Sequence, residues 1–146
     1  MGIRTALRTI VLADKQAQNP LLSAGVLALL GNPPRMYSIH IPQGVLTTTV
    51  TSALAFQIID NISDKNLKGV ATLFKNRMQF TIWARDVSVA SSIFHALQLL
   101  LDGYGNAVVG DTYIDRIFHL GDHDDREPES QYYKIYVDYR IIWRLA

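Results

Sequence analysis

The chain has 146 residues, a net charge of +1 and no cysteine. This length predicts a single domain that spans residues 1–146, and the balanced charge gives no general attraction to nucleic acid or to membranes. Without cysteine, disulfide bonds and thiol chemistry are excluded. Hydrophobic residues make up 49% of the chain and charged residues 18%, which indicates a chain that folds around a core.

Two short helices are expected first. Residues 3–13, "IRTALRTIVLA", place apolar side chains on one helical stripe and two arginines on the other side. Pro20 cannot continue that helix, and residues 21–31, "LLSAGVLALLG", are expected to form a second helix that Gly31 ends. The apolar run in this second helix is far shorter than the roughly 18 residues of a membrane span, so no membrane association is expected.

After a proline turn the hydrophobic pattern changes to period two, which predicts β-strands. Residues 35–41 alternate weakly, whereas residues 52–60, "SALAFQIID", and 76–85, "NRMQFTIWAR", alternate clearly. The polar segment between the last two is expected to form a hairpin tip whose strands extend past the rest of the sheet.

Asp86 offers a side-chain cap to the helix that follows it, "VSVASSIFHALQLLLDG". The apolar side chains of this helix form a wide stripe that must cover an apolar sheet face: Ala90, Ile93, Phe94, Leu97 and Leu101. Gly103 follows its end. This segment is the clearest helix in the sequence.

Two more alternating segments complete the predicted sheet. Residues 111–120, "DTYIDRIFHL", are expected to place Ile114, Phe118 and Leu120 on one face, and residues 132–144, "YYKIYVDYRIIWR", alternate most clearly of all. The order helix, helix, strand pair, helix, strand pair predicts an α+β fold. It would have an antiparallel four-stranded sheet covered on one face by the long helix, with the N-terminal helices beside it.

The segment between the last two strands is acidic. Its residues 121–130, "GDHDDREPES", are expected to form a strongly negative loop with these acids: Asp122, Asp124, Asp125, Glu127 and Glu129. His119 and His123 have the spacing of metal ligands on a helix, but Gly121 and the neighbouring strands argue against a helix here. On a strand the two histidines would share one face roughly 13 Å apart. No metal site and no cofactor are therefore expected.

Other signatures of enzymes are missing from the sequence. No glycine-rich phosphate loop follows a strand, and "GYGNAVVG" lacks the lysine of such a loop. No serine lies in a nucleophile elbow, and His40, His95 and His119 fall in apolar segments where a structural role is expected. The order of elements also departs from that of an RNA-recognition domain. The sequence therefore predicts a protein that is not an enzyme.

The polar face of the predicted sheet mixes aromatic and basic side chains. If the strands pair as expected, it carries Trp83, Arg85, Tyr132, Lys134, Tyr136, Arg140 and Arg144. Such a mixture is typical of a protein interface. A solvated sheet face is the alternative interpretation.

Taken together, these segments resemble the tail-terminator proteins of long-tailed bacteriophages, also called tail-completion or head–tail joining proteins. The resemblance lies in "LRTIVLAD", in "LLSAGVLALLG" before a proline turn, in "ALAFQIIDNIS" and in the final "YYKIYVDYRIIWR". Its strongest part is "NRMQFTIWARDVSVASSIFHALQLLLDG", where a strand runs directly into a helix that begins with small residues. Residues 122–130 and the segment "GVLTTTVT" depart from the family pattern.

The resemblance implies a non-enzymatic virion structural protein of a siphophage, made in the host cytoplasm. Such proteins form a homomeric ring, usually of six subunits, on the head-proximal end of the tail. The ring ends polymerisation of the tail tube protein and offers a docking surface to the head connector or stopper protein. Viral DNA would pass through its lumen without sequence-specific binding. The acidic residues are candidates either for the lumen, where they would repel phosphates, or for a loop elsewhere.

Two alternatives remain at this point. The first is another neck or tail-tube component of the phage, because such proteins share an architecture of sheet plus helix. The second, from a different class, is a small metal-dependent hydrolase that uses His119, Asp122 and His123.

Overall fold

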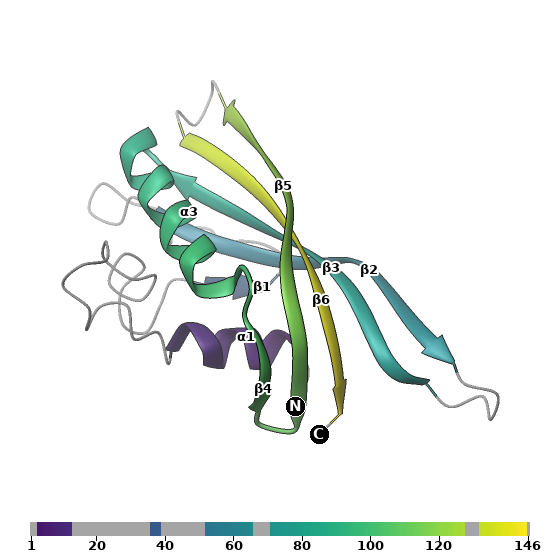
Figure 1. Cartoon of the computed structure of the whole chain (residues 1–146). Coiled ribbons are helices and arrows are strands. Elements are labelled where there is room, and N and C mark those ends of the chain that lie inside the picture. Colours follow the sequence, from purple (N-terminus) through teal and green to yellow (C-terminus); the bar gives the residue numbers. More distant parts are fainter. Residues whose placement is uncertain (1–2, 13–35, 39–51, 66–70, 128–131, 146) are drawn as a thin grey trace.

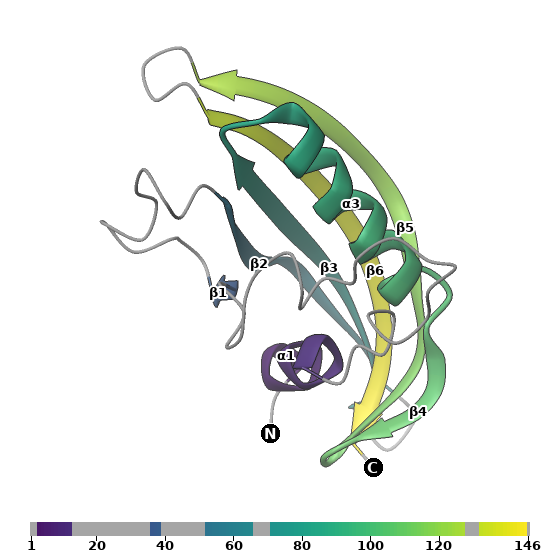
Figure 2. The same ribbon diagram turned by 90° about the vertical axis from the view of Figure 1, so that its left-hand side faces the viewer.

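The computed structural model describes residues 3–12, 36–38, 52–65, 71–127 and 132–145. Its elements are α1 (Ile3–Leu12), β1 (Met36–Ser38), β2 (Ser52–Lys65), β3 (Ala71–Ala84), α3 (Val87–Leu101), β4 (Gly105–Val109), β5 (Thr112–Glu127) and β6 (Tyr132–Leu145). The six strands form one sheet in the order β1-β2-β3-β6-β5-β4. The sheet curls, and both helices lie on its concave side (Figures 1 and 2). Within these residues no helix is long and apolar enough to cross a membrane.

The predicted four-stranded antiparallel sheet is wrong. The sheet has two further strands, and it is mixed because β1 pairs with β2 in parallel. Two short helices share its concave side in place of one long covering helix. β1 has three residues and lies within the weakly alternating segment 35–41, which the predicted four-stranded sheet left out, and β4 has five residues, too few alternating positions to be recognised in the sequence.

Two long antiparallel hairpins build most of the sheet. β2 pairs with β3 and β5 pairs with β6, and the two hairpins join where β3 pairs with β6 from Phe74↔Trp143 to Ala84↔Tyr133. The β2–β3 pairing continues beyond this junction to Lys65↔Ala71, so the hairpin diverges from β5 and β6 at one end (Figure 1). The predicted tip itself, residues 66–70, lies outside the described residues.

The core fills the space between the concave side of the sheet and the two helices. In β3 the residues expected to point inward are all buried: Met78, Phe80, Ile82 and Ala84. In β6 four of the six expected residues are buried, which are Ile135, Val137, Tyr139 and Ile141. Tyr133 and Trp143 are half-buried, and Tyr132, expected on the polar face, is only 8% exposed. The largest fully buried side chains come from α1, α3 and the four long strands: Leu7, Leu54, Met78, Phe80, Ile82, Ile93, Leu97, Leu101, Ile114 and Tyr139. The Phe80 ring lies 6.0 Å from that of Phe56 and 5.6 Å from that of Tyr139, which joins three strands in one aromatic cluster.

Both described helices begin as their sequences predict. Asp86 caps α3 by accepting a hydrogen bond of 2.9 Å from the Ser88 backbone N–H, and Gly103 follows the helix with φ 81°. α1 buries Ile3, Ala6, Leu7 and Ile10 in the core. The second predicted helix, residues 21–31, lies outside the described residues.

β5 does not alternate as the sequence suggests. Its pairing with β6 shifts by one residue between Ile114 and Arg116, and again after His119. An extra residue in a strand moves every following side chain to the opposite face. Ile114 and Ile117 are therefore buried together, whereas Phe118 is 41% exposed and Leu120 is 49% exposed. The expectation that Ile114, Phe118 and Leu120 share one face is wrong.

Candidate assembly surfaces

The convex face of the sheet carries the aromatic and basic residues singled out in the sequence. The strand register sets Trp83 opposite Lys134, Thr81 opposite Tyr136 and Arg77 opposite Arg140 on this face. Tyr132 and Arg144 share it through the alternation of β6, and the Arg85 guanidinium lies over the Tyr132 ring. The structure thus brings all seven of those residues to the same side of the sheet: Trp83, Arg85, Tyr132, Lys134, Tyr136, Arg140 and Arg144.

Contacts between cations and aromatic rings hold one end of this face in place. The Lys134 Nζ lies 4.0 Å from the centre of the Trp83 ring. Arg85 Nε donates a hydrogen bond of 3.1 Å to the Tyr132 hydroxyl, and its guanidinium lies 5.4 Å from the ring centre. Each such contact contributes about 0.5–1 kcal/mol at an exposed site. These side chains are therefore already ordered within the subunit.

Ion pairs hold the middle of the convex face. Arg77 contacts Asp138 at 2.5 Å, and Arg140 contacts Asp60 at 3.1 Å. Asp60 also accepts a hydrogen bond of 3.0 Å from the Arg77 backbone N–H, next to the irregular pairing after Ile58 in β2. The hydrogen bond to Asp138 raises the pKa of Arg77. Since Arg140 is already paired inside its own subunit, reversing its charge would perturb the subunit as well as any interface.

Positive charge dominates the convex face. Among the residues whose side chains the structure describes, seven basic side chains share it with three carboxylates, which are Asp60, Asp125 and Asp138. The basic side chains are Lys75, Arg77, Arg85, Arg116, Lys134, Arg140 and Arg144.

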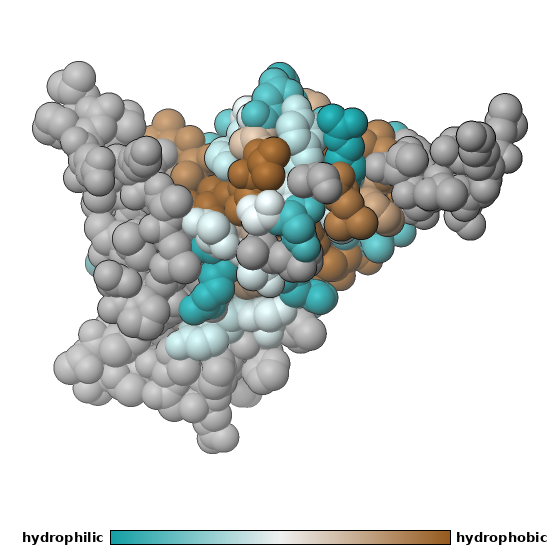
Figure 3. Space-filling view, turned by 90° about the horizontal axis from the view of Figure 1, so that it is seen from below, coloured by the Kyte–Doolittle hydropathy of each residue, from teal (hydrophilic) through white to brown (hydrophobic). Residues whose placement is uncertain are grey.

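One end of the convex face is both basic and apolar, and we call it the basic–aromatic end: Val108, Tyr113, Arg116, Phe118 and Arg144. The Arg144 guanidinium lies 4.5 Å from the centre of the Tyr113 ring, and that of Arg116 lies 6.0 Å from the Phe118 ring. Val108 is 62% exposed. Seen from the end where β4 turns into β5, hydrophobic patches lie directly beside hydrophilic side chains (Figure 3). Sequence reasoning found only Arg144 here. The shifts in β5 hide the positions of Arg116 and Phe118, and β4, which carries Val108, is too short to be recognised.

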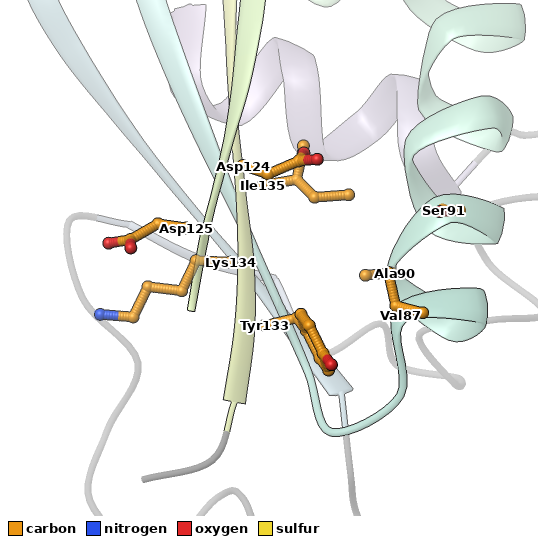
Figure 4. Close-up of a pocket in the computed structure, with 8 residues that line it drawn as sticks. All are labelled: Val87, Ala90, Ser91, Asp124, Asp125, Tyr133, Lys134 and Ile135. Carbon is orange, nitrogen blue, oxygen red and sulfur yellow. The ribbon is translucent and has the colours of Figure 1, made fainter. Parts of the chain in front are cut away.

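A groove lies on the other side of the sheet, between α3 and the hairpin of β5 and β6. We call it the acidic groove, and its volume is about 330 Å³. α3 lines it with Val87, Ala90 and Ser91, and the strands line it with Asp124, Tyr133 and Ile135. Asp124 and Ile135 point toward α3, whereas the bordering Asp125 and Lys134 point away from it (Figure 4).

The acidic segment of the sequence is a strand and not the predicted loop, because β5 continues to Glu127. Asp122 pairs opposite Val137 and Asp124 opposite Ile135, which places both on the concave side, whereas Asp125 pairs opposite Lys134 on the convex face. Asp122 and Asp124 therefore share one face of β5, and Asp125 lies on the other. Glu127 is the last residue of β5, and Glu129 lies outside the described residues.

The surroundings of α3 are acidic. The helix itself contains no charged residue, and four carboxylates lie at its ends and beside it: Asp86, Asp102, Asp122 and Asp124. The hydrogen bond from the Ser88 backbone lowers the pKa of Asp86. Asp102 accepts a hydrogen bond of 3.0 Å from the His119 backbone N–H. The concave side around α3 is thus opposite in charge to the convex face.

His119 and His123 lie on opposite faces of β5, so the expectation that they share a face is wrong. The shift after His119 causes this difference. His119 packs against the rings of Phe94 and Tyr139 on the concave side, and its Nε2 lies 3.1 Å from Asp122 Oδ1 without an aligned hydrogen bond. His123 stacks on Tyr136 at 4.7 Å on the convex face. In the part of the chain that the structure describes, no group of three or more histidine, aspartate or glutamate side chains could hold a metal ion.

Comparison with known proteins finds chains of similar fold among solved structures. No protein-family model matches the sequence, and no curated protein matches it either. A chain from a solved structure described as "Virion of native gene transfer agent (GTA) particle" is similar in fold, with a TM-score of 0.67. The match covers 98% of this chain and 98% of that chain, at 16% sequence identity. At this identity the similarity concerns the fold.

Proposed function

We propose that the protein is a structural component of a phage-like virion, and that it forms the homomeric ring, of six copies, that caps the tail tube. The ring ends polymerisation of the tube and offers a docking surface to the head connector. The observation that carries this proposal is the fold relative from a virion particle, because the match extends over nearly the whole of both chains. The sequence resemblance to tail-terminator proteins supports the same assignment.

The convex face and the acidic groove fit a protein that functions by binding other protein subunits. Binding energy in interfaces is concentrated in a few aromatic and arginine side chains, which are the residue types of the convex face. Several of these side chains are held by contacts within the subunit, such as Lys134 on Trp83, so little conformational entropy is lost when a partner binds. Contacts between two different surfaces of the same chain generate closed rings when the rotation between copies closes.

Deletion of the gene from its parent virus tests the role in the tail. Without a cap, we expect tails of irregular and excessive length that fail to join heads, because nothing ends the growth of the tube. Electron micrographs measure both features. Absence of tails would point to the alternative, a tube or other neck component. Tails of uniform length that join heads in the absence of this protein would contradict the proposal.

A second test uses purified components. Added to polymerising tail tube protein, the chain should stop elongation when about one ring is present per tube end, so the mean tube length should fall as its concentration rises. Negative-stain images of the protein alone should show rings. The matched control is a variant that cannot associate, such as those described below, which should leave tube length unchanged.

A further inference from the structure

We propose that neighbouring subunits join by placing the basic–aromatic end of one copy in the acidic groove of the next. This inference rests on the proposed ring and names the contact that closes it. It commits to a second copy of this chain as the occupant of the groove.

The groove is built to receive a long cationic side chain. Its walls are apolar at Val87, Ala90 and Ile135, and the Asp124 carboxylate lies at its border. Asp124 is exposed and forms no hydrogen bond or ion pair with any residue whose side chain the structure describes. An arginine can pack its aliphatic stem along apolar walls while its guanidinium reaches a carboxylate through charge-assisted hydrogen bonds.

The basic–aromatic end offers such side chains. Arg116 and Arg144 are exposed, and neither forms an ion pair with a described carboxylate. Their guanidinium groups lie over the rings of Phe118 and Tyr113, and Val108 lies beside them as an exposed apolar residue. The combination of cation and apolar surface is the chemical complement of the groove.

Geometry requires that the partner be another molecule. Arg116 and Asp124 lie on the same strand, and eight residues of a strand span about 25 Å. They also point to opposite sides of the sheet, as the pairing of Arg116 with Ile142 and of Asp124 with Ile135 shows. The two surfaces therefore cannot meet within one subunit. Because they differ from each other, each copy presents one free groove and one free basic–aromatic end, which is the arrangement that closes a ring.

Charge reversal on either side tests the contact in the full chain. The variants are Asp124→Lys for the groove and the double substitution Arg116→Glu with Arg144→Glu for the other surface. Each should weaken self-association by about tenfold or more, because each leaves like charges opposed in the contact. Mass photometry and sedimentation measure the assembly, and Arg4→Glu on the exposed side of α1 is the matched control that should assemble as the wild type does.

Mixing the two variants gives the sharpest result. The Asp124→Lys chain keeps an intact basic–aromatic end, and the double variant keeps an intact groove. An equimolar mixture should therefore recover rings in which the two chains alternate. The intact end fits the intact groove, and the lysine introduced at position 124 faces the glutamates introduced at positions 116 and 144. Rings formed by either variant alone, or no recovery of association on mixing, would overturn the proposed contact.

The salt dependence of the wild type needs no substitution, so it decides the question even if a variant fails to fold. Exposed ion pairs are screened over about 10 Å at 0.1 M salt, so the dissociation constant should rise as sodium chloride increases. Rings that are insensitive to salt would contradict this contact and leave the proposed function standing. A wild-type chain that associates neither alone nor on tail tubes would contradict both.

Discussion

Tyr139 connects the sheet to the helix that covers it. Its ring is fully buried beside Phe80, and its hydroxyl donates a hydrogen bond to Gln98 Oε1 on α3. Burial raises the pKa of Tyr139, and the nearby carboxylates of Asp102 and Asp122 raise it further. The folded protein therefore holds this tyrosine in its neutral form.

Replacement of Tyr139 by phenylalanine should lower the free energy of unfolding by about 1 kcal/mol at neutral pH, through loss of the hydrogen bond. The pH dependence has a definite sign. An unfolded tyrosine ionises near pH 10, before the folded one does, so the wild type should keep its stability below pH 10 and lose it as the pH rises further. Urea titrations across this range should show a shallower loss in Tyr139→Phe, and equal slopes would contradict the argument.

Gly105 shows how closely β4 approaches its neighbour. A Cβ atom at this position would collide with the Asp115 carbonyl oxygen and would lie 3.1 Å from Arg116 Cα, both of which belong to the backbone. Gly105→Ala should therefore cost about 1–3 kcal/mol, or detach β4 from β5. Gly121→Ala is the matched control, since no atom lies within 4 Å of the added methyl group. Similar denaturation midpoints for the two variants would show that the approach is not tight.

At the scale of elements, one stripe of buried side chains attaches α3 to the sheet. Leu97 is fully buried, whereas Leu99, two residues later, is 54% exposed. Leu97→Ala should lower the free energy of unfolding by about 2–5 kcal/mol, because it removes buried methyl groups and leaves a cavity. Leu99→Ala should change it by less than about 0.5 kcal/mol. Thermal or chemical denaturation compares the two, and a small loss for Leu97→Ala would mean that α3 does not pack as described.

For the whole molecule, the central strands should be the most stable. β3 and β6 are paired on both sides, whereas β4 pairs only with β5 and has five residues. Hydrogen exchange measured on the unassociated chain should be at least about 100-fold slower in β3 and β6 than in β4, since edge strands open locally with little free energy. Equal protection of β4 would indicate that the sheet unfolds only as one unit.

Much of the architecture is visible in local patterns. The cap at Asp86, the apolar stripe that includes Leu97 and the strict alternation around Val137 each follow from neighbours in the chain, so α3, β3 and β6 and their buried faces could be predicted. The same alternation predicted that Trp83 and Lys134 lie on one face, which the register confirms. Helix and strand periodicities are local properties, and a single sequence contains them.

The features that local patterns could not supply depend on contacts between distant segments. β1 gives only a weak alternation and β4 is too short to be recognised, and each is a strand because a longer strand pairs with it. The shifts in β5 moved Phe118 outward and separated His119 from His123, because an extra residue reverses the faces that follow it. The position of the Asp124 carboxylate at a groove also emerged only from the packing of α3 beside β6. The sequence by itself therefore determined which residues pair into helices and long strands, whereas strand register and neighbours decided which surfaces those residues form.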